Sequence, residues 1–243
     1  AWADVDNDED QDMVIVGDWM PVKIFINENG KFTDQSEKFG LSNTEGWWHT
    51  IIARDLNADG KVDFVLGNHG LNSHFKASAL KPVTMYVNDF DLNGSVEQII
   101  CTFNDDKSYP LLMKDDLVKQ IPSLSVKFKQ FADYKDATIE DIFSPEVLRR
   151  ALRLSARLME SCVMMNTGNG SFHLTPLPLE TQFSPVYAII ADDFDSDGQC
   201  DIIIGGNQYR AKPETGIYDA SYGLLLKSDS IGTWHSVSSV KSG

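Results

Sequence analysis

The sequence predicts an all-β protein, a partial β-propeller of about three to four four-stranded blades with a small α-helical insertion. Three observations lead to this fold class. Four nine-residue acidic segments share one pattern, each is followed by a short β-branched run, and turns and strands recur at similar intervals after them. Short strands in repeated four-stranded units are typical of propeller blades.

Composition narrows the range of partners. The chain has 243 residues and a formal net charge of −15. This charge argues against a nucleic-acid partner, because phosphates bind to a basic surface. A membrane-spanning helix needs about 18 consecutive apolar residues, and the sequence contains no such run, so we expect no membrane span.

The negative charge is concentrated in four segments. Residues 4–12, 55–63, 89–97 and 193–201, named here loops 1 to 4, hold 16 of the 36 acidic residues and one basic residue. In the rest of the chain the acidic and basic residues balance. A solvated acidic surface would distribute its charge more evenly, so this concentration indicates bound cations.

The four loops share the spacing of a calcium-binding turn. Each has an oxygen-bearing side chain at positions 1, 3, 5 and 9, and three have the glycine at position 6 that permits a sharp turn at positive φ. Calcium takes about six to eight oxygen ligands, and position 7 would add its backbone carbonyl. We therefore predict up to four Ca²⁺ sites, formed by Asp4, Asp6, Asp8, Asp10 and Asp12; Asp55, Asn57, Asp59, Lys61 and Asp63; Asp89, Asp91, Asn93, Ser95 and Glu97; and Asp193, Asp195, Asp197, Gln199 and Asp201.

Loops 1 and 3 depart most from the shared pattern. Loop 1 has Glu9 in place of glycine, so a side chain must enter the left-handed region at a cost of about 1 kcal/mol. Loop 3 has Asn93 at position 5 and Glu97 at position 9, which gives it less charge with the same number of oxygen-bearing side chains.

The alternative of an EF-hand is excluded by position 12 of each loop. An EF-hand needs a bidentate glutamate there and a helix on each side. The residues at this position are Ile15, Leu66, Ile100 and Ile204, within short β-branched runs that predict buried strands. We therefore expect the loops to join adjacent strands.

Three regions are expected along the chain. Residues 1–106 should form blades with loops 1 to 3, residues 107–160 a mainly helical insertion, and residues 161–243 the remaining blade or blades with loop 4. The insertion contains apolar residues at helical spacing, a proline that should divide this helix, and a Ser-Pro start for another helix. The residues concerned are Leu117, Ile121, Leu124, Phe128 and Phe131, then Pro122, then Ser144 and Pro145.

The loops and their flanking strands resemble a known family. A DxDxDGxxD loop followed by an apolar strand and glycine resembles the FG-GAP and VCBS repeats of integrin-α-like β-propellers. The strings GWWHTIIARDLNADGKVDFVLGNHGLNS and PLPLETQFSPVYAIIADDFDSDG are similar to the propeller of bacterial proteins that carry an ASPIC/UnbV domain, which are related to cartilage acidic protein. This resemblance implies a secreted or surface calcium-binding propeller with no established reaction.

A second set of candidate residues lies in the connections at the opposite ends of the strands. Aromatic and amide side chains suit contact with a carbohydrate or peptide. The alternative is that the tryptophan packs between blades and the asparagines cap turns. The candidate ligand-binding residues are Trp19, Asn68, His69, Asn72, Asn207, Tyr209 and Arg210.

The function that the sequence favours is a calcium-binding module that binds a carbohydrate or protein ligand, as in adhesion, outside the cytoplasm. The alternatives are a part of a calcium-dependent glycan-cleaving enzyme and a passive scaffold. No HExxH, GxSxG, P-loop or Rossmann glycine motif occurs, so we expect no enzymatic activity. Three to four blades do not close a typical propeller, so we expect the rest of a larger propeller or a second copy as a partner.

Overall fold

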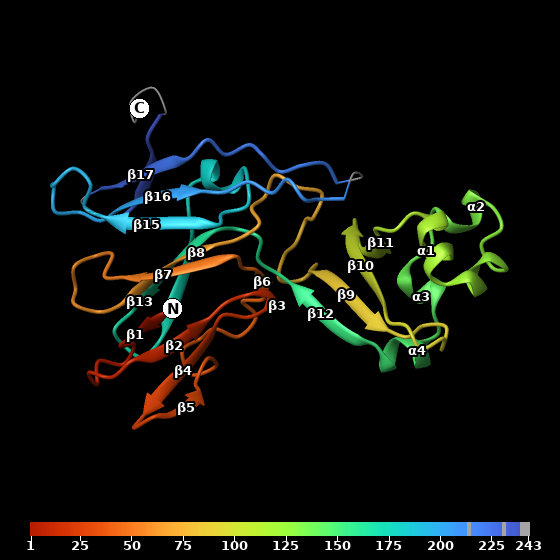
Figure 1. Cartoon of the computed structure of the whole chain (residues 1–243), viewed down its shortest axis with the longest axis horizontal. Helices are drawn as coiled ribbons and strands as arrows, with labels where there is room; N and C mark the ends of the chain where they lie inside the picture. Colours follow the sequence, from red (N-terminus) through yellow and green to blue (C-terminus); the bar gives the residue numbers. More distant parts are fainter. Residues whose placement is uncertain (213–214, 230–231, 239–243) are drawn as a thin grey trace. The chain divides into compact units, whose positions relative to one another are not determined.

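The computed structural model describes residues 1–212, 215–229 and 232–238 (Figure 1). The chain forms two compact units. Unit 1 comprises residues 1–74 and 158–243, and unit 2 comprises residues 75–157. Unit 2 is therefore an insertion in the sequence of unit 1. No helix in the described ranges is both long and apolar enough to cross a membrane.

Unit 1 contains three antiparallel sheets of four strands each, named here blades 1 to 3, which lie face to face (Figure 1). They confirm the prediction of an all-β partial propeller with four-stranded blades. Blade 1 is formed by β1 (Trp2–Ala3), β2 (Asp12–Ile15), β4 (Lys23–Glu28) and β5 (Lys31–Asp34). Blade 2 is formed by β7 (Thr50–Arg54), β8 (Asp63–Gly67), β13 (Cys162–Asn166) and β14 (Phe172–Pro176). Blade 3 is formed by β15 (Ala188–Asp192), β16 (Asp201–Gly205), β17 (Leu224–Ser228) and β18 (Trp234–Ser236).

Shorter elements connect these blades. A two-stranded sheet of β3 (Asp18–Met20) and β6 (Gly46–Trp47) lies between blades 1 and 2 in the sequence. The 3₁₀ helix η2 (Leu179–Gln182) precedes blade 3.

Blade 2 contains two strands that precede unit 2 in the sequence and two that follow it. Strand β8 pairs with β13, which lies about a hundred residues later, and Val65 is opposite Val163. Residues 83–88 lie in the region 1–106 that the sequence predicts to form blades with loops 1 to 3, but they contribute strand β9 to unit 2 instead. The insertion therefore spans residues 75–157, whereas the sequence predicts boundaries at residues 106/107 and 160/161. Both apolar runs are suitable partners for β8, and contacts between distant residues decide which of them pairs with it.

Two apolar cores lie between the blades of unit 1. Phe64 packs with blade 1 in the first core, which also contains Ile24. Val65 packs with blade 3 in the second core, which also contains Ile202. Neighbouring residues of β8 reach opposite cores because successive side chains of a strand point to opposite faces of the sheet. Blade 2 is therefore buried on both faces.

The outer face of blade 3 is apolar but exposed. Ile190 is opposite Ile203 in the pairing of β15 with β16, as Ile52 is opposite Val65 in the pairing of β7 with β8. Val65 is fully buried, whereas Ile190 and Ile203 are 59% and 37% exposed. In blade 2 these positions are covered by the next blade.

Unit 2 combines a sheet with short helices (Figure 1). The strands are β9 (Val83–Asn88), β10 (Glu97–Asn104), β11 (Lys107–Pro110) and β12 (Leu152–Ala156), in the order β11-β10-β9-β12. The helices are α1 (Lys114–Gln120), η1 (Pro122–Ser125), α2 (Phe131–Tyr134), α3 (Ile139–Ile142) and α4 (Pro145–Arg150).

The helical pattern of the insertion is largely confirmed. Pro122 ends α1 and begins η1, and α4 begins at Pro145 after the N-cap Ser144. The predicted apolar positions are buried except Phe131, which is 52% exposed because a new helix, α2, begins there.

Candidate metal centres

All four acidic loops have the same backbone conformation and join adjacent antiparallel strands. They connect β1 to β2, β7 to β8, β9 to β10 and β15 to β16, which confirms that they are strand connections and not EF-hands. Positions 4 and 6 have positive φ in every loop. The angles are 62° at Asn7, 58° at Ala58, 60° at Leu92 and 63° at Ser196, then 73° at Glu9, 80° at Gly60, 89° at Gly94 and 86° at Gly198. Glu9 thus occupies the left-handed region, as predicted.

The carboxylate at position 1 holds each loop closed. Its two oxygens accept the backbone N–H groups of positions 5 and 6, and this repeated pair of hydrogen bonds explains why one sequence pattern gives one turn. The donors are Asp8 and Glu9 to Asp4, Asp59 and Gly60 to Asp55, Asn93 and Gly94 to Asp89, and Asp197 and Gly198 to Asp193, at 2.8–3.2 Å.

The carboxylate at position 9 is buried and attaches the loop to the blade. In unit 1 it accepts a backbone N–H from the strand that follows in the sheet, and in loops 1 and 2 also one from position 2. The bonds run from Val5 and Asn27 to Asp12, from Leu56 and Asn166 to Asp63, and from Ser228 to Asp201, at 2.7–3.3 Å. In loop 3, Glu97 accepts the N–H of Phe90 at 3.0 Å. The side chain at position 9 therefore stabilises the fold through hydrogen bonds and is also a candidate ligand.

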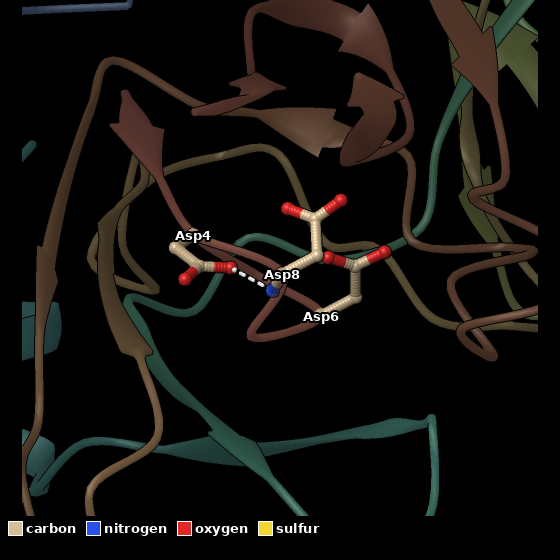
Figure 2. Close-up of side chains that lie close together, drawn as sticks. All are labelled: Asp4, Asp6 and Asp8. Carbon is tan, nitrogen blue, oxygen red and sulfur yellow. Dashed lines mark hydrogen bonds between the residues drawn. The ribbon is translucent and has the colours of Figure 1, made fainter. Parts of the chain in front are cut away.

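Three loops bring carboxylate oxygens together. One oxygen from each of three residues lies within 4.8 Å of the others in loops 1, 3 and 4. The triplets are Asp4, Asp6 and Asp8; Asp89, Asp91 and Glu97; and Asp193, Asp195 and Asp197. Figure 2 shows the triplet of loop 1, where Asp6 and Asp8 are held on the turn that Asp4 closes. Burial, followed by the charges of Asp12, Asp8, Asp4 and Asp10, raises the pKa of Asp6.

Several carboxylate oxygens of the loops suit a cation as a partner. Oδ1 of Asp10, Oδ1 of Asp91 and Oδ2 of Asp201 are buried and have no hydrogen-bond partner among the described residues. Burial raises the pKa of Asp201, and burial followed by the charge of Asp8 raises that of Asp10. An oxygen that is buried without a donor is costly unless a cation or water approaches it, so these residues fit a hard divalent ion. The sequence pattern indicates a backbone carbonyl as the ligand from position 7, and the side chain of Asp10 is an additional candidate.

Loops 2 and 4 each have a lysine beside their carboxylates. Lys61 Nζ lies 3.2 Å from Asp59 Oδ2 in loop 2. Lys227, which lies on β17, forms an ion pair with Asp195 of loop 4. The pKa of Asp195 is lowered by this contact. The sequence does not predict Lys227, because it lies far from the loop along the chain and is brought to it only by the pairing of the strands.

The predicted ligand-binding residues occupy different environments. Asn68 is fully buried and joins backbone groups: its Oδ1 accepts the N–H of Trp47 and of His69, and its Nδ2 donates to two carbonyls. Asn207 similarly holds the backbone of Ser221.

The other members of the set reach the surface or the aromatic interior. The Nδ2 group of Asn72 donates to the carbonyl of Phe183. Tyr209 and Arg210 are exposed. The rings of Trp19 and His69 both contact that of Trp47, which is not among the ligand-binding residues predicted from the sequence.

Comparison with known proteins identifies one part of the chain. A search of curated proteins gives no match. The family model of the FG-GAP-like repeat matches residues 4–66, which contain loops 1 and 2 with β2 to β8. This match supports the expected relation to FG-GAP repeats for that segment, which covers β2, β4 and β5 of blade 1 and β7 with most of β8 of blade 2.

Proposed function

We propose that this chain is a calcium-binding β-propeller module that binds a carbohydrate or protein ligand outside the cytoplasm, as in adhesion. The observation that carries the proposal is the repetition of one hydrogen-bonded turn in four places, which in three of them brings three carboxylate oxygens within 4.8 Å of one another. A resemblance to ASPIC/UnbV-type propellers is consistent with it and stays a prediction.

The chemistry of the loops suits calcium better than softer metals. The available donors are carboxylate, amide and carbonyl oxygens, which are the ligands of calcium and magnesium. Side chains at positions 1, 3, 5 and 9 and the carbonyl of position 7 are the candidate ligands of the ion. The ion would neutralise carboxylates that otherwise repel one another at close range.

The proposed location follows from the type of site. Extracellular calcium modules bind with a Kd of about 10⁻⁴–10⁻³ M. Exposed loops of this kind would be filled where calcium is abundant, which supports a role outside the cytoplasm.

A melting experiment tests the calcium proposal. EDTA should lower the melting temperature, and excess calcium should restore it, because an ion that binds only the folded state stabilises that state. Asp6→Asn should reduce the response to calcium, since Asp6 belongs to the triplet of loop 1 and no hydrogen bond of the described fold needs it. Glu37→Gln removes one exposed charge outside the loops and serves as the matched control. A melting temperature that EDTA and calcium both leave unchanged would contradict the proposal.

The exposed face of blade 3 supports the proposal that the rest of a larger propeller or a second copy of the chain packs on this module. Because Ile190 and Ile203 match positions that blade 2 buries, we expect a further blade to cover them. Ile190→Ser with Ile203→Ser should reduce self-association of the chain in sedimentation experiments if a second copy supplies that cover. No association in the unmodified chain would exclude the second copy.

A further inference from the structure

A group of rings lies at the end of the blades opposite the acidic loops in unit 1. The loops join the first two strands of each blade, so residues that precede the first strand or follow the second lie at the other end. Six aromatic residues meet this condition and form a chain of ring contacts, which we name the aromatic face. They are Trp19, Trp47, His49, His69, Tyr187 and Tyr218.

The contacts in this group are close. The ring centroids of Trp19 and Trp47 are 5.0 Å apart, as are those of Trp47 and His69, and those of His69 and Tyr218 are 4.8 Å apart. Trp47, His69 and Tyr218 are all less than 9% exposed. These three residues therefore form a fixed base that joins the connections of all three blades.

Trp19 is held in an unfavourable backbone conformation. Its φ is +63°, and the pairing of β3 with β6 shifts register between Asp18 and Met20. A bulky residue rarely adopts this conformation, and such residues gather at sites where binding or catalysis needs them. The side chain of Trp19 therefore does not follow the regular alternation of side chains along β3. Its indole contacts the edge or face of the Trp47 ring in a T-shaped arrangement.

Tyr187 provides the accessible part of the aromatic face. Its ring lies parallel to that of His49, with centroids 4.4 Å apart and an interplanar angle of 21°, and the residue is 43% exposed. His49 therefore packs against one face of the phenol ring, while 43% of the residue stays exposed to solvent. The hydroxyl of Tyr187 lies 3.4 Å from Oε1 of Gln208, so a phenol and an amide stand side by side at the edge of the ring.

A carboxylate completes the surroundings of Tyr187. Oδ1 of Asp18 lies 3.7 Å from Nδ1 of His49, and the side chain of Asp18 is 60% exposed, whereas that of His49 is 13% exposed. Nε2 of His49 is buried without a hydrogen-bond partner in the described part of the chain. The imidazole thus supports the phenol, and the exposed Asp18 carboxylate remains available as a hydrogen-bond acceptor.

We propose that Tyr187, Asp18 and Gln208 form a binding site for the ring of a neutral saccharide. A sugar ring offers an apolar face that can pack on the phenol and hydroxyl groups that both donate and accept hydrogen bonds. The polar groups around Tyr187 also include both donors and acceptors. An organic cation would pack on the same ring but would use only Asp18, which is why the mixed chemistry favours a saccharide. The inference rests on the binding-module part of the proposed function and does not require calcium.

Titration of the whole chain with defined oligosaccharides tests the site. Cellohexaose, maltohexaose, chitohexaose and mannohexaose are added to the protein, with and without calcium in the buffer. Binding is followed by calorimetry and by tryptophan fluorescence, since Trp19 follows Asp18 in the chain and Trp47 is opposite Asp18 in the pairing of β3 with β6. We expect at least one of them to bind. Tyr187→Ala should weaken that binding about tenfold, as truncation of a central aromatic residue commonly does. Tyr187→Phe, which keeps the ring, should stay within about threefold.

Two further variants show whether binding occurs at Tyr187 or at another exposed ring. Trp2→Ala removes a ring that packs on Phe32 in blade 1, and should leave binding unchanged. Asp18→Asn should weaken binding about three- to tenfold, because a charged acceptor is lost.

Three outcomes decide the proposal. If none of the four oligosaccharides binds, or if Tyr187→Ala binds as tightly as the unmodified chain, the proposal is wrong. Salt-sensitive binding of tetramethylammonium without oligosaccharide binding would assign the site to a cation instead. Failure of the calcium melting experiment would leave this result unaffected, so the two proposals fail separately.

Discussion

Replacement of Asp63 by asparagine should destabilise the calcium-free protein. Asp63 is fully buried, and its two oxygens accept the N–H of Leu56 at 3.0 Å and that of Asn166 at 2.7 Å. The second bond connects β8 to β13 across the whole insertion. An asparagine can accept one of these bonds, but its NH₂ group then faces the other N–H.

The expected loss can be worked out from these contacts. A buried donor that loses its partner costs about 1–3 kcal/mol. Part of this loss is offset because an amide is easier to bury than a carboxylate, and burial raises the pKa of Asp63. We therefore expect Asp63→Asn to lower the free energy of unfolding by about 1–2 kcal/mol, which corresponds to a fall of about 2–8 °C in melting temperature for a unit of this size.

The assay is a thermal melt in excess EDTA, combined with hydrogen exchange. Asp63→Asn should melt earlier, and the amide of Asn166 should exchange faster than in the unmodified chain. Asp59→Asn is the matched control in the same loop: its Oδ1 accepts the N–H of Lys61 at 2.9 Å, which asparagine can also accept. It should melt almost like the unmodified chain and bind calcium less tightly. Equal melting of Asp63→Asn and the unmodified chain without calcium would refute the structural role of position 9.

Three further predictions concern the loops and the aromatic face. Lys227→Ala should raise the calcium affinity of loop 4 about two- to fivefold in calorimetry, because the ammonium pairs with Asp195 and competes with the ion; unchanged or weaker binding would show that the lysine does not compete. Glu9→Gly should stabilise the calcium-free chain by up to about 1 kcal/mol in denaturant unfolding, since φ at this position is +73°; a loss of stability would mean that the Glu9 side chain contributes more than the strain costs. Burial, followed by the charge of His49, lowers the pKa of His69 to about 4. Because this value lies below the unfolded value of 6.5, the unfolded state binds the proton more tightly, so the stability due to neutral His69 is complete above about pH 6.5 and is lost as the pH falls towards 4. His69→Phe should therefore show a smaller fall in melting temperature between pH 7 and pH 5 than the unmodified chain, and an equal fall would argue against burial of a neutral imidazole.

The acidic loops could be predicted because their structure is local. Asp55 closes its turn on the N–H groups of Asp59 and Gly60, all within six residues. A repeated local pattern therefore gives the turn, the glycine position and the strands on both sides. The same reasoning predicted the positive φ of Glu9.

The extent of the insertion could not be predicted, because it depends on contacts between distant residues. The run that contains β9 is as apolar as β13, and periodicity predicts a strand in both cases. What distinguishes them is the bond from Asn166 to Asp63 and the packing of Val163 in the second core. Neither can be recognised from spacing in the sequence.

The aromatic face could be predicted only in part from the sequence, for the same reason. Trp19 and His69 were candidates, but Tyr187 precedes a strand and carries no motif. Its role depends on stacking with His49, and the two residues are far apart in the chain. Asn68, in contrast, has the fixed backbone contacts of a structural residue.

The most direct test of calcium binding by the loops is a crystal structure of the chain grown in excess calcium and measured for anomalous scattering. We predict ions in loops 1, 3 and 4, each bound by the carboxylate triplet, and weaker occupancy in loop 2, where Lys61 lies beside Asp59. Ordered loops that contain no ion under these conditions, with the oxygens of Asp6, Asp91 and Asp195 turned to solvent, would contradict it.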